Sequence, residues 1–297
     1  ASRKLKVQKQ TAGAWASGND MGTARYGFGD AGIQTAAMGF GGHSGTNKNE
    51  TETYDGTTWT EVNNLNKSRR HLAGCGTTTA ALGFGGYDPG TPNPWEAPET
   101  EKWDGTSWTE VNDLTTARRQ LGGCGTQTAA LGFGGYRYPG VGGPNDYTNS
   151  EEFNGTSWTE GNDLNTGRNY LQGAGIQTSA IAIAGQAPGT TQIAICEKYD
   201  GTSWTESGDL NTNRSRLGAA GATNTAILAF GGTPPTANTE QFDGSSWTEI
   251  GDMTAGRYGL GGAGTTTAAL AFGGSHPIVA STEEFAFSTS VETIAFD

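Results

Sequence analysis

Six arginines recur at one fixed position along the chain and are the first candidates for chemistry. Each lies ten residues after a tryptophan. A ring of guanidinium groups would bind an anion or an acidic peptide, because the planar guanidinium matches carboxylate and phosphate geometry. An equal number of glutamates precedes a second repeated aromatic residue, and these fixed offsets indicate internal ion pairs instead. The arginines are Arg25, Arg69, Arg118, Arg168, Arg214 and Arg257, and the glutamates are Glu52, Glu101, Glu152, Glu197, Glu240 and Glu284.

Groups suited to catalysis or metal binding are few. The three histidines are His43, His71 and His276, and no two of them are close enough in sequence to form a zinc-ligand pair. The order of residues offers no Ser-His-Asp triad, and the many glycine pairs precede loops rather than phosphate-binding helices. Cys75 and Cys124 occupy equivalent places in the repeat, which is typical of small buried residues. We therefore expect no catalytic residues, no metal and no cofactor.

Composition disfavours several classes of partner. The chain has 297 residues and a net charge of −12, which argues against nucleic acid or an anionic membrane as the main partner, because both are negatively charged. No apolar run approaches the roughly 20 residues of a membrane span, so we expect no membrane insertion. Glycine is abundant, with 49 residues, but it does not recur at every third position, which excludes a collagen.

One repeated sequence positions all of these residues. The phrase "GTTTAALGFGG" at 76–86 returns in six versions, and "DGTSWTEVNDL" at 104–114 returns in five. From each arginine to the glycine that closes the first phrase there are 17 or 18 residues, whereas the interval from that glycine to the next tryptophan varies from 15 to 23. We therefore predict that the variable segment is a surface loop and that the rest is packed. The tryptophans, expected to be structural, are Trp15, Trp59, Trp108, Trp158, Trp204 and Trp247.

Each copy of the repeat predicts four short strands, called A to D here. In the second copy they cover 71–78, 80–86, 100–105 and 107–112. An Asp-Gly or Asn-Gly pair between C and D favours a hairpin. Strand A is rich in glycine, which suits an inner strand beside a central channel, where other backbones come close.

The glycine pair that closes strand B, the aromatic-Asp-Gly turn, the tryptophan and the arginine together resemble the kelch repeat, whose length is about 50 residues. The resemblance covers almost the whole chain and implies an all-β fold, a single β-propeller of four-stranded kelch-like blades. The sequence of the repeat is also similar to the repeats of the kelch-like proteins of bacteriophages and other viruses.

The two ends of the chain have complementary gaps. The last copy has Phe285 at the place of the strand-C aromatic, but Ser290 stands where the tryptophan of strand D is expected. Near the N-terminus, Trp15 supplies a strand D that has no strand C before it. We therefore predict six blades, closed by the N-terminal strand, which removes a free sheet edge. The propeller then spans 11–287, between a basic N-terminal arm at 1–10 and a C-terminal tail at 288–297.

The antiparallel strand order places the B–C and D–A loops on one face of the propeller. The two longest B–C loops, 87–99 and 136–151, belong to the neighbouring blades 2 and 3 and are rich in aromatic residues. Such rings are large and stiff contact surfaces for sugars or proteins, so we predict a ligand-binding patch here, the alternative being that they hold their own loops in place. The predicted patch consists of Tyr87, Trp95, Tyr136, Tyr138 and Tyr147, with Arg137 and Asp146 as polar contacts.

Three classes of function remain open at this point. We expect first a non-catalytic interaction module on a virion, as part of a phage fibre or capsid decoration, or on a cell surface, where it binds a host glycan or protein or other virion proteins. The second is a cytoplasmic adaptor of the kelch type that holds an acidic peptide over the arginine ring. The third is a hydrolase or oxidase that uses the propeller as a scaffold. A composition rich in Thr, Gly and Asn favours the first.

Overall fold

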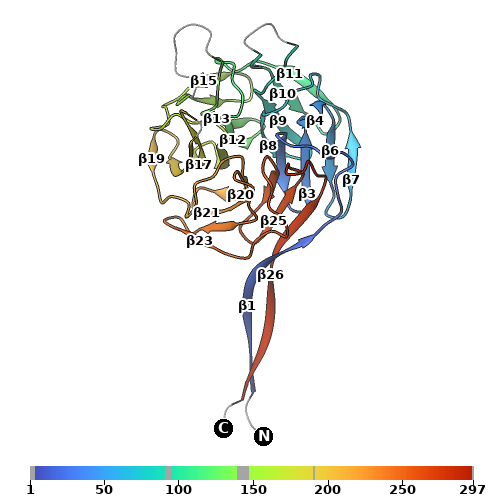
Figure 1. Cartoon of the computed structure of the whole chain (residues 1–297), viewed down its shortest axis with the longest axis vertical. Helices are drawn as coiled ribbons and strands as arrows, with labels where there is room; N and C mark the ends of the chain where they lie inside the picture. The colour runs from blue at the N-terminus through green and yellow to red at the C-terminus, as the bar shows by residue number, and fades with distance from the viewer. Residues whose placement is uncertain (1–3, 91–94, 139–146, 190, 296–297) are drawn as a thin grey trace.

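The structure, a computed structural model, is a ring of β-sheets around a central axis (Figure 1). It describes residues 4–90, 95–138, 147–189 and 191–295, and for 4–12 and 288–295 only the backbone. Within these residues there is no helix, and six four-stranded antiparallel sheets follow one another around the ring. The predicted six-bladed β-propeller is confirmed.

Blade 2 shows how the repeat forms a blade. Its strands are β8 (Ala73–Thr77), β9 (Ala80–Phe84), β10 (Thr100–Trp103) and β11 (Trp108–Val111), each within the range predicted from the sequence. The other complete blades are blade 1 with β2 (Gly29–Ile33), β3 (Ala36–Phe40), β6 (Thr51–Tyr54) and β7 (Trp59–Val62), blade 3 with β12 (Gly122–Thr126), β13 (Ala129–Phe133), β14 (Ser150–Phe153) and β15 (Trp158–Glu160), blade 4 with β16 (Gln172–Ile176), β17 (Ser179–Ala187), β18 (Thr191–Tyr199) and β19 (Trp204–Glu206), and blade 5 with β20 (Gly218–Thr223), β21 (Ala226–Phe230), β22 (Thr239–Phe242) and β23 (Trp247–Glu249).

Blade 6 joins the two ends of the chain. Its order is β24 (Gly261–Gly264), β25 (Ala268–Phe272), β26 (Thr282–Ala295) and β1 (Lys4–Ser17), so the N-terminal strand is the outermost strand. Trp15 lies opposite Phe285, in the same register as Trp108 opposite Trp103 in blade 2. Closure by the N-terminal strand is therefore confirmed.

Beyond blade 6, β1 and β26 continue together as a two-stranded ribbon. Backbone pairing extends from Gln10 opposite Thr289 to Lys4 opposite Ala295, after a register shift between Gln10 and Gly13. The ribbon projects from the ring and carries both ends of the described chain side by side (Figure 1). The segments expected as an N-terminal arm and a C-terminal tail thus pair with each other over their described parts.

The repeated tryptophans pack between neighbouring blades. The ring of Trp108 in blade 2 lies 4.8 Å from that of Phe40 in blade 1, and its Nε1 donates to Oγ1 of Thr51 at 3.0 Å. The same bond to the first residue of the preceding strand C recurs from Trp15 to Thr239, Trp59 to Thr282, Trp158 to Thr100 and Trp204 to Ser150.

Blade 5 departs from this tryptophan pattern. Cys196 occupies the equivalent place in blade 4, and Trp247 donates instead to the carbonyl of Gly208. A thiol is a weak acceptor, so the indole takes a backbone oxygen. The tryptophans thus pack as wedges between neighbouring blades.

The glycines of the inner strands are explained by crowding at the axis. A Cβ on Gly74 would lie 2.5 Å from the carbonyl oxygen of Asp30 in the neighbouring blade, and one on Gly173 would lie 2.6 Å from that of Gly123. Larger residues would push the blades apart.

One expectation about the variable segments needs correction. In blade 4 the segment after strand B is not a loop, because β17 and β18 continue past the blade as a hairpin up to Ala187 opposite Thr191. Blade 1 likewise carries a small hairpin of β4 (His43–Ser44) and β5 (Thr46–Asn47) in this segment. In these two copies the variable segment therefore forms a β-hairpin and not an irregular loop.

Candidate binding face

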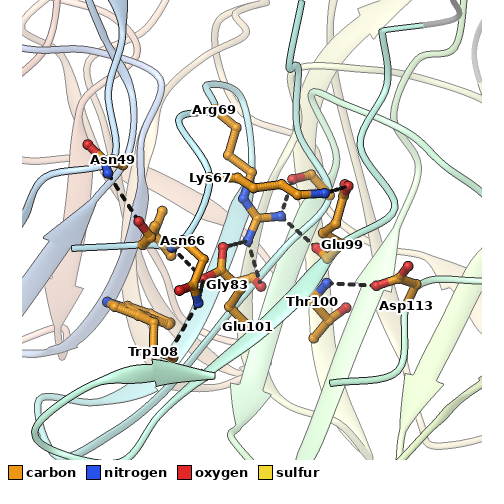
Figure 2. A network of polar contacts seen from close by, with 12 residues as sticks. Asn49, Asn66, Lys67, Arg69, Gly83, Glu99, Thr100, Glu101, Trp108 and Asp113 are labelled. Atoms are coloured by element: carbon orange, nitrogen blue, oxygen red, sulfur yellow. Dashed lines mark hydrogen bonds and ion pairs between the residues drawn. The ribbon is translucent and has the colours of Figure 1, made fainter. Parts of the chain in front are cut away.

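The six repeated arginines are buried inside the blades, where each pairs with a glutamate. Arg69 is completely buried, and its Nη2 contacts Oε1 of Glu101 at 3.0 Å (Figure 2). Its Nη1 donates to the carbonyls of Gly85 and Glu99 at 2.9 and 2.6 Å. Burial lowers the pKa of Arg69, and the charge of Glu101 opposes that effect. All six residues are at most 2% exposed, so they hold the blades together and do not lie on a binding surface.

Two of the expected partners of these arginines are wrong by one residue. Arg118 pairs with Glu151 at 2.9 Å rather than with Glu152, and Arg257 pairs with Glu283 at 3.1 Å rather than with Glu284. In the other four blades the expected partner is present.

Strand geometry explains the two corrections. The paired glutamate always stands two residues before the strand-C aromatic, and successive side chains of a strand point to opposite faces. Glu152 and Glu284 therefore face the next blade, where each accepts a hydrogen bond from a tyrosine hydroxyl at 2.6 Å, from Tyr199 and Tyr54 respectively.

The B–C loops of blades 2 and 3 meet at an exposed aromatic cluster. The ring of Trp95 lies 6.3 Å from that of Tyr87 and 6.1 Å from that of Tyr138. Trp95 is 39% exposed and Tyr138 is 46% exposed, so the rings are not buried by the packing of their own loops. Glu96 joins the two loops, because its Oε1 accepts from the backbone N–H of Tyr138 at 3.3 Å and lies 3.5 Å from Nε of Arg119.

The remaining residues of the predicted patch lie around this cluster. Tyr136 is half-buried beneath the guanidinium of Arg119, which is 4.9 Å from the centre of its ring. Arg137 is exposed. Tyr147 is half-buried, and its backbone N–H donates to Gly135 at 2.9 Å. Asp146 lies outside the described residues. The structure thus brings Tyr87, Trp95 and Tyr138 into contact, with Tyr136 beside them.

A second feature of this face is a ring of residues around the axis, which the sequence analysis did not identify. It is formed by the residue two places after each repeated arginine. Backbone N–H groups donate around the complete circle at 2.6–2.9 Å, each to the carbonyl of the residue in the neighbouring blade. This axial ring consists of Gly27, His71, Gln120, Tyr170, Arg216 and Gly259.

Every residue of the axial ring has a left-handed backbone, with φ between 52° and 64°. This conformation costs a residue other than glycine about 1–2 kcal/mol. Four of the six positions nevertheless carry a side chain, and such strain concentrates at functional sites. The signal was present in the sequence, because this position holds five residue types in a repeat that is otherwise nearly constant.

The axial ring surrounds a small cavity at the mouth of the central channel. The cavity has a volume of about 70 Å³ and is lined by Tyr26, His71, Gln120, Tyr170 and Arg216 above a floor of leucines. Burial, together with the charges of Arg70, Arg119 and Arg216, holds the pKa of His71 well below its usual value. The positive charge at the mouth therefore comes from the arginines.

The opposite end of the channel has a different character. Its cavity, of about 110 Å³, is lined mainly by inner-strand glycines and alanines together with Asp30 and two cysteines, Cys75 and Cys124. One carboxylate oxygen of Asp30 accepts from the backbone N–H of Gly262 at 2.8 Å. Burial raises the pKa of Asp30 to about 7. All three cysteines of the chain are buried and unpaired.

Two properties of the described residues bear on the possible chemistry. The described residues contain no group of three or more His, Cys, Asp or Glu side chains placed to hold a metal ion. They also contain no helix long and apolar enough to cross a bilayer. His43 and His71 are both neighbours of Tyr26, with ring centres 5.4 and 6.2 Å from it, but they do not form a ligand set.

Comparison with known proteins adds no family to this description, because neither a protein-family model nor a curated protein matches the chain. The structure shows a six-bladed β-propeller, and the likeness to the kelch repeat rests on the repeat sequence.

Proposed function

We propose that the chain is a non-catalytic binding module of the kelch type, carried on a virion or cell surface, which recognises a host glycan or protein through the aromatic cluster of Tyr87, Trp95 and Tyr138. The observation that carries this proposal is the exposure of Trp95 and Tyr138, two large rings in contact with each other on loops that the repeat does not require. Exposed aromatic rings with polar surroundings are typical anchors for such ligands.

The surroundings of the cluster support a preformed surface. Glu96 links the two loops through Tyr138 and Arg119, so the cluster is held before a ligand arrives. Preorganised contacts lose less entropy on binding. The six repeated arginines give no comparable support to an adaptor that holds an acidic peptide, because they are buried and paired with glutamates.

The test compares two double variants in glycan-array and cell-binding assays. Replacement of Trp95 and Tyr138 by alanine should leave the melting temperature unchanged and weaken binding by at least tenfold, roughly 1.4 kcal/mol. The control replaces Ile33 and Ile176 by alanine. These residues are 54% and 46% exposed at the ends of inner strands on the opposite face, and this variant should bind normally. Full binding by the Trp95→Ala/Tyr138→Ala variant would refute the proposal.

A further inference from the structure

The axial cavity collects positive charge on a chain that is acidic overall. The sequence has 30 acidic and 18 basic residues, yet the described residues that line the cavity include no Asp or Glu. Arg216 lines the cavity directly, and the charges of Arg70 and Arg119 act on His71 in its wall. A negatively charged group is therefore favoured here by the surrounding field.

Two of these arginines are held in place without being neutralised. The guanidinium of Arg216 stacks on Tyr170, 3.8 Å from the centre of its ring, and that of Arg70 lies 4.7 Å from the ring centre of Tyr87. Neither forms an ion pair with any residue that the structure describes. No carboxylate among those residues therefore cancels the charge of either guanidinium.

The Arg216 side chain is present at the cost of backbone strain. Its φ of 56° is close to the 64° of Gly259 and the 61° of Gly27, which occupy the next two places of the ring. Packing does not require a side chain at this position, because two blades close the ring with glycine. The arginine at this strained position therefore serves a purpose other than completing the ring of blades.

The floor of the cavity limits what can enter. Leu72, Leu121, Leu171, Leu217 and Leu260, together with Phe28, line the cavity beneath the axial ring and are all buried. This apolar floor lowers the local dielectric constant and so strengthens the attraction between a guanidinium and an anion. A volume of about 70 Å³ accepts a single small group rather than a chain segment.

We propose that the axial cavity binds one carboxylate group, which Arg216 holds while Arg70 supplies further positive charge nearby. The carboxylate comes from a free small acid or from an acidic sugar. The site borders the aromatic cluster of the B–C loops, because Arg70 stacks on Tyr87, but it does not depend on the function proposed for that cluster.

The test measures binding of acetate, glucuronate and glucose to the whole chain by calorimetry and thermal shift. Either acid should bind and raise the melting temperature, and glucose, which lacks the carboxylate, should not. Binding of both acids indicates a site for any carboxylate, and binding of glucuronate alone indicates an acidic sugar. Binding of neither acid at 100 mM would overturn the proposal.

Variants at Arg216 separate binding from folding. Arg216→Gly should abolish acid binding and raise the melting temperature, because glycine adopts the left-handed backbone without strain. Arg216→Gln should weaken binding at least tenfold. The control, Lys102→Gln, removes a cation from β10, away from the cavity, and should bind the acid as the unmodified chain does. Unchanged acid binding by both Arg216 variants would refute the assignment.

Discussion

Trp15 and Phe285 face each other across the two ends of the chain, in the register that a tryptophan and a strand-C aromatic occupy in every other blade. Their rings lie 5.3 Å apart, and Trp15 also packs edge-on against Phe230 of blade 5 at 4.9 Å. Trp15 therefore completes blade 6 through Phe285 and joins this blade to blade 5 through Phe230.

This closure predicts a sharp difference between two truncations. Removal of residues 1–10 should change stability little, because Gly13–Ser17 still pairs with Glu283–Phe287. Removal of residues 1–17 deletes Trp15 and should lower the free energy of unfolding by about 3 kcal/mol or more, as for the loss of a buried tryptophan. Chemical denaturation measures both. Equal stability of the two truncated chains would contradict closure by β1.

The arginine pairs predict a difference between two adjacent glutamates. Glu151→Gln leaves the charge of buried Arg118 without compensation and should cost about 3 kcal/mol. Glu152→Gln should cost about 1 kcal/mol, because it only weakens a hydrogen bond from Tyr199. Denaturant unfolding curves of the two variants measure the two losses of stability. A larger loss for Glu152→Gln would indicate that Arg118 pairs with Glu152, as expected from the sequence.

Ala184 offers a stabilising substitution. It occupies the place of the first glycine in the closing pair and has a φ of 54°, close to the 64° of Gly134 in blade 3. Ala184→Gly should therefore raise the free energy of unfolding by about 1 kcal/mol. As a control, Gly134→Ala should destabilise the chain, because its Cβ would lie 2.9 Å from the carbonyl of Arg168. A destabilised Ala184→Gly variant would show that packing of the methyl group outweighs backbone strain.

Asp30 predicts a dependence of stability on pH. Its pKa in the folded chain, about 7, exceeds the ordinary value of 3.8, so the folded state binds the proton more tightly than the unfolded state. The contribution of Asp30 is then greatest below pH 4 and is lost as the pH rises through 7. Allowing for screening by water in the channel, Asp30→Asn should stabilise the chain by about 2 kcal/mol at pH 8 and have little effect at pH 4. A difference between the two chains that does not change with pH would contradict this account.

Much of the fold followed from the sequence because the repeat is local. The spacing between Trp108 and Arg118, and its recurrence in every copy, was enough to place strands A to D and to count six blades. Closure followed from matching the missing strand of the last copy with the unpaired strand of Trp15. The exposed pair of Trp95 and Tyr138 was also predicted, because loops that lie outside the repeat are free to present side chains.

What only the tertiary structure decided depends on contacts between residues far apart in the chain. The choice of Glu151 over Glu152 depends on which face of β14 turns toward buried Arg118, and both residues satisfy the same local pattern. The axial ring brings together positions such as His71 and Arg216, which no local periodicity relates and which meet only when the blades close into a circle. A left-handed backbone at Arg216 is likewise imposed by hydrogen bonds to the neighbouring blades, since an arginine in an isolated chain would avoid it.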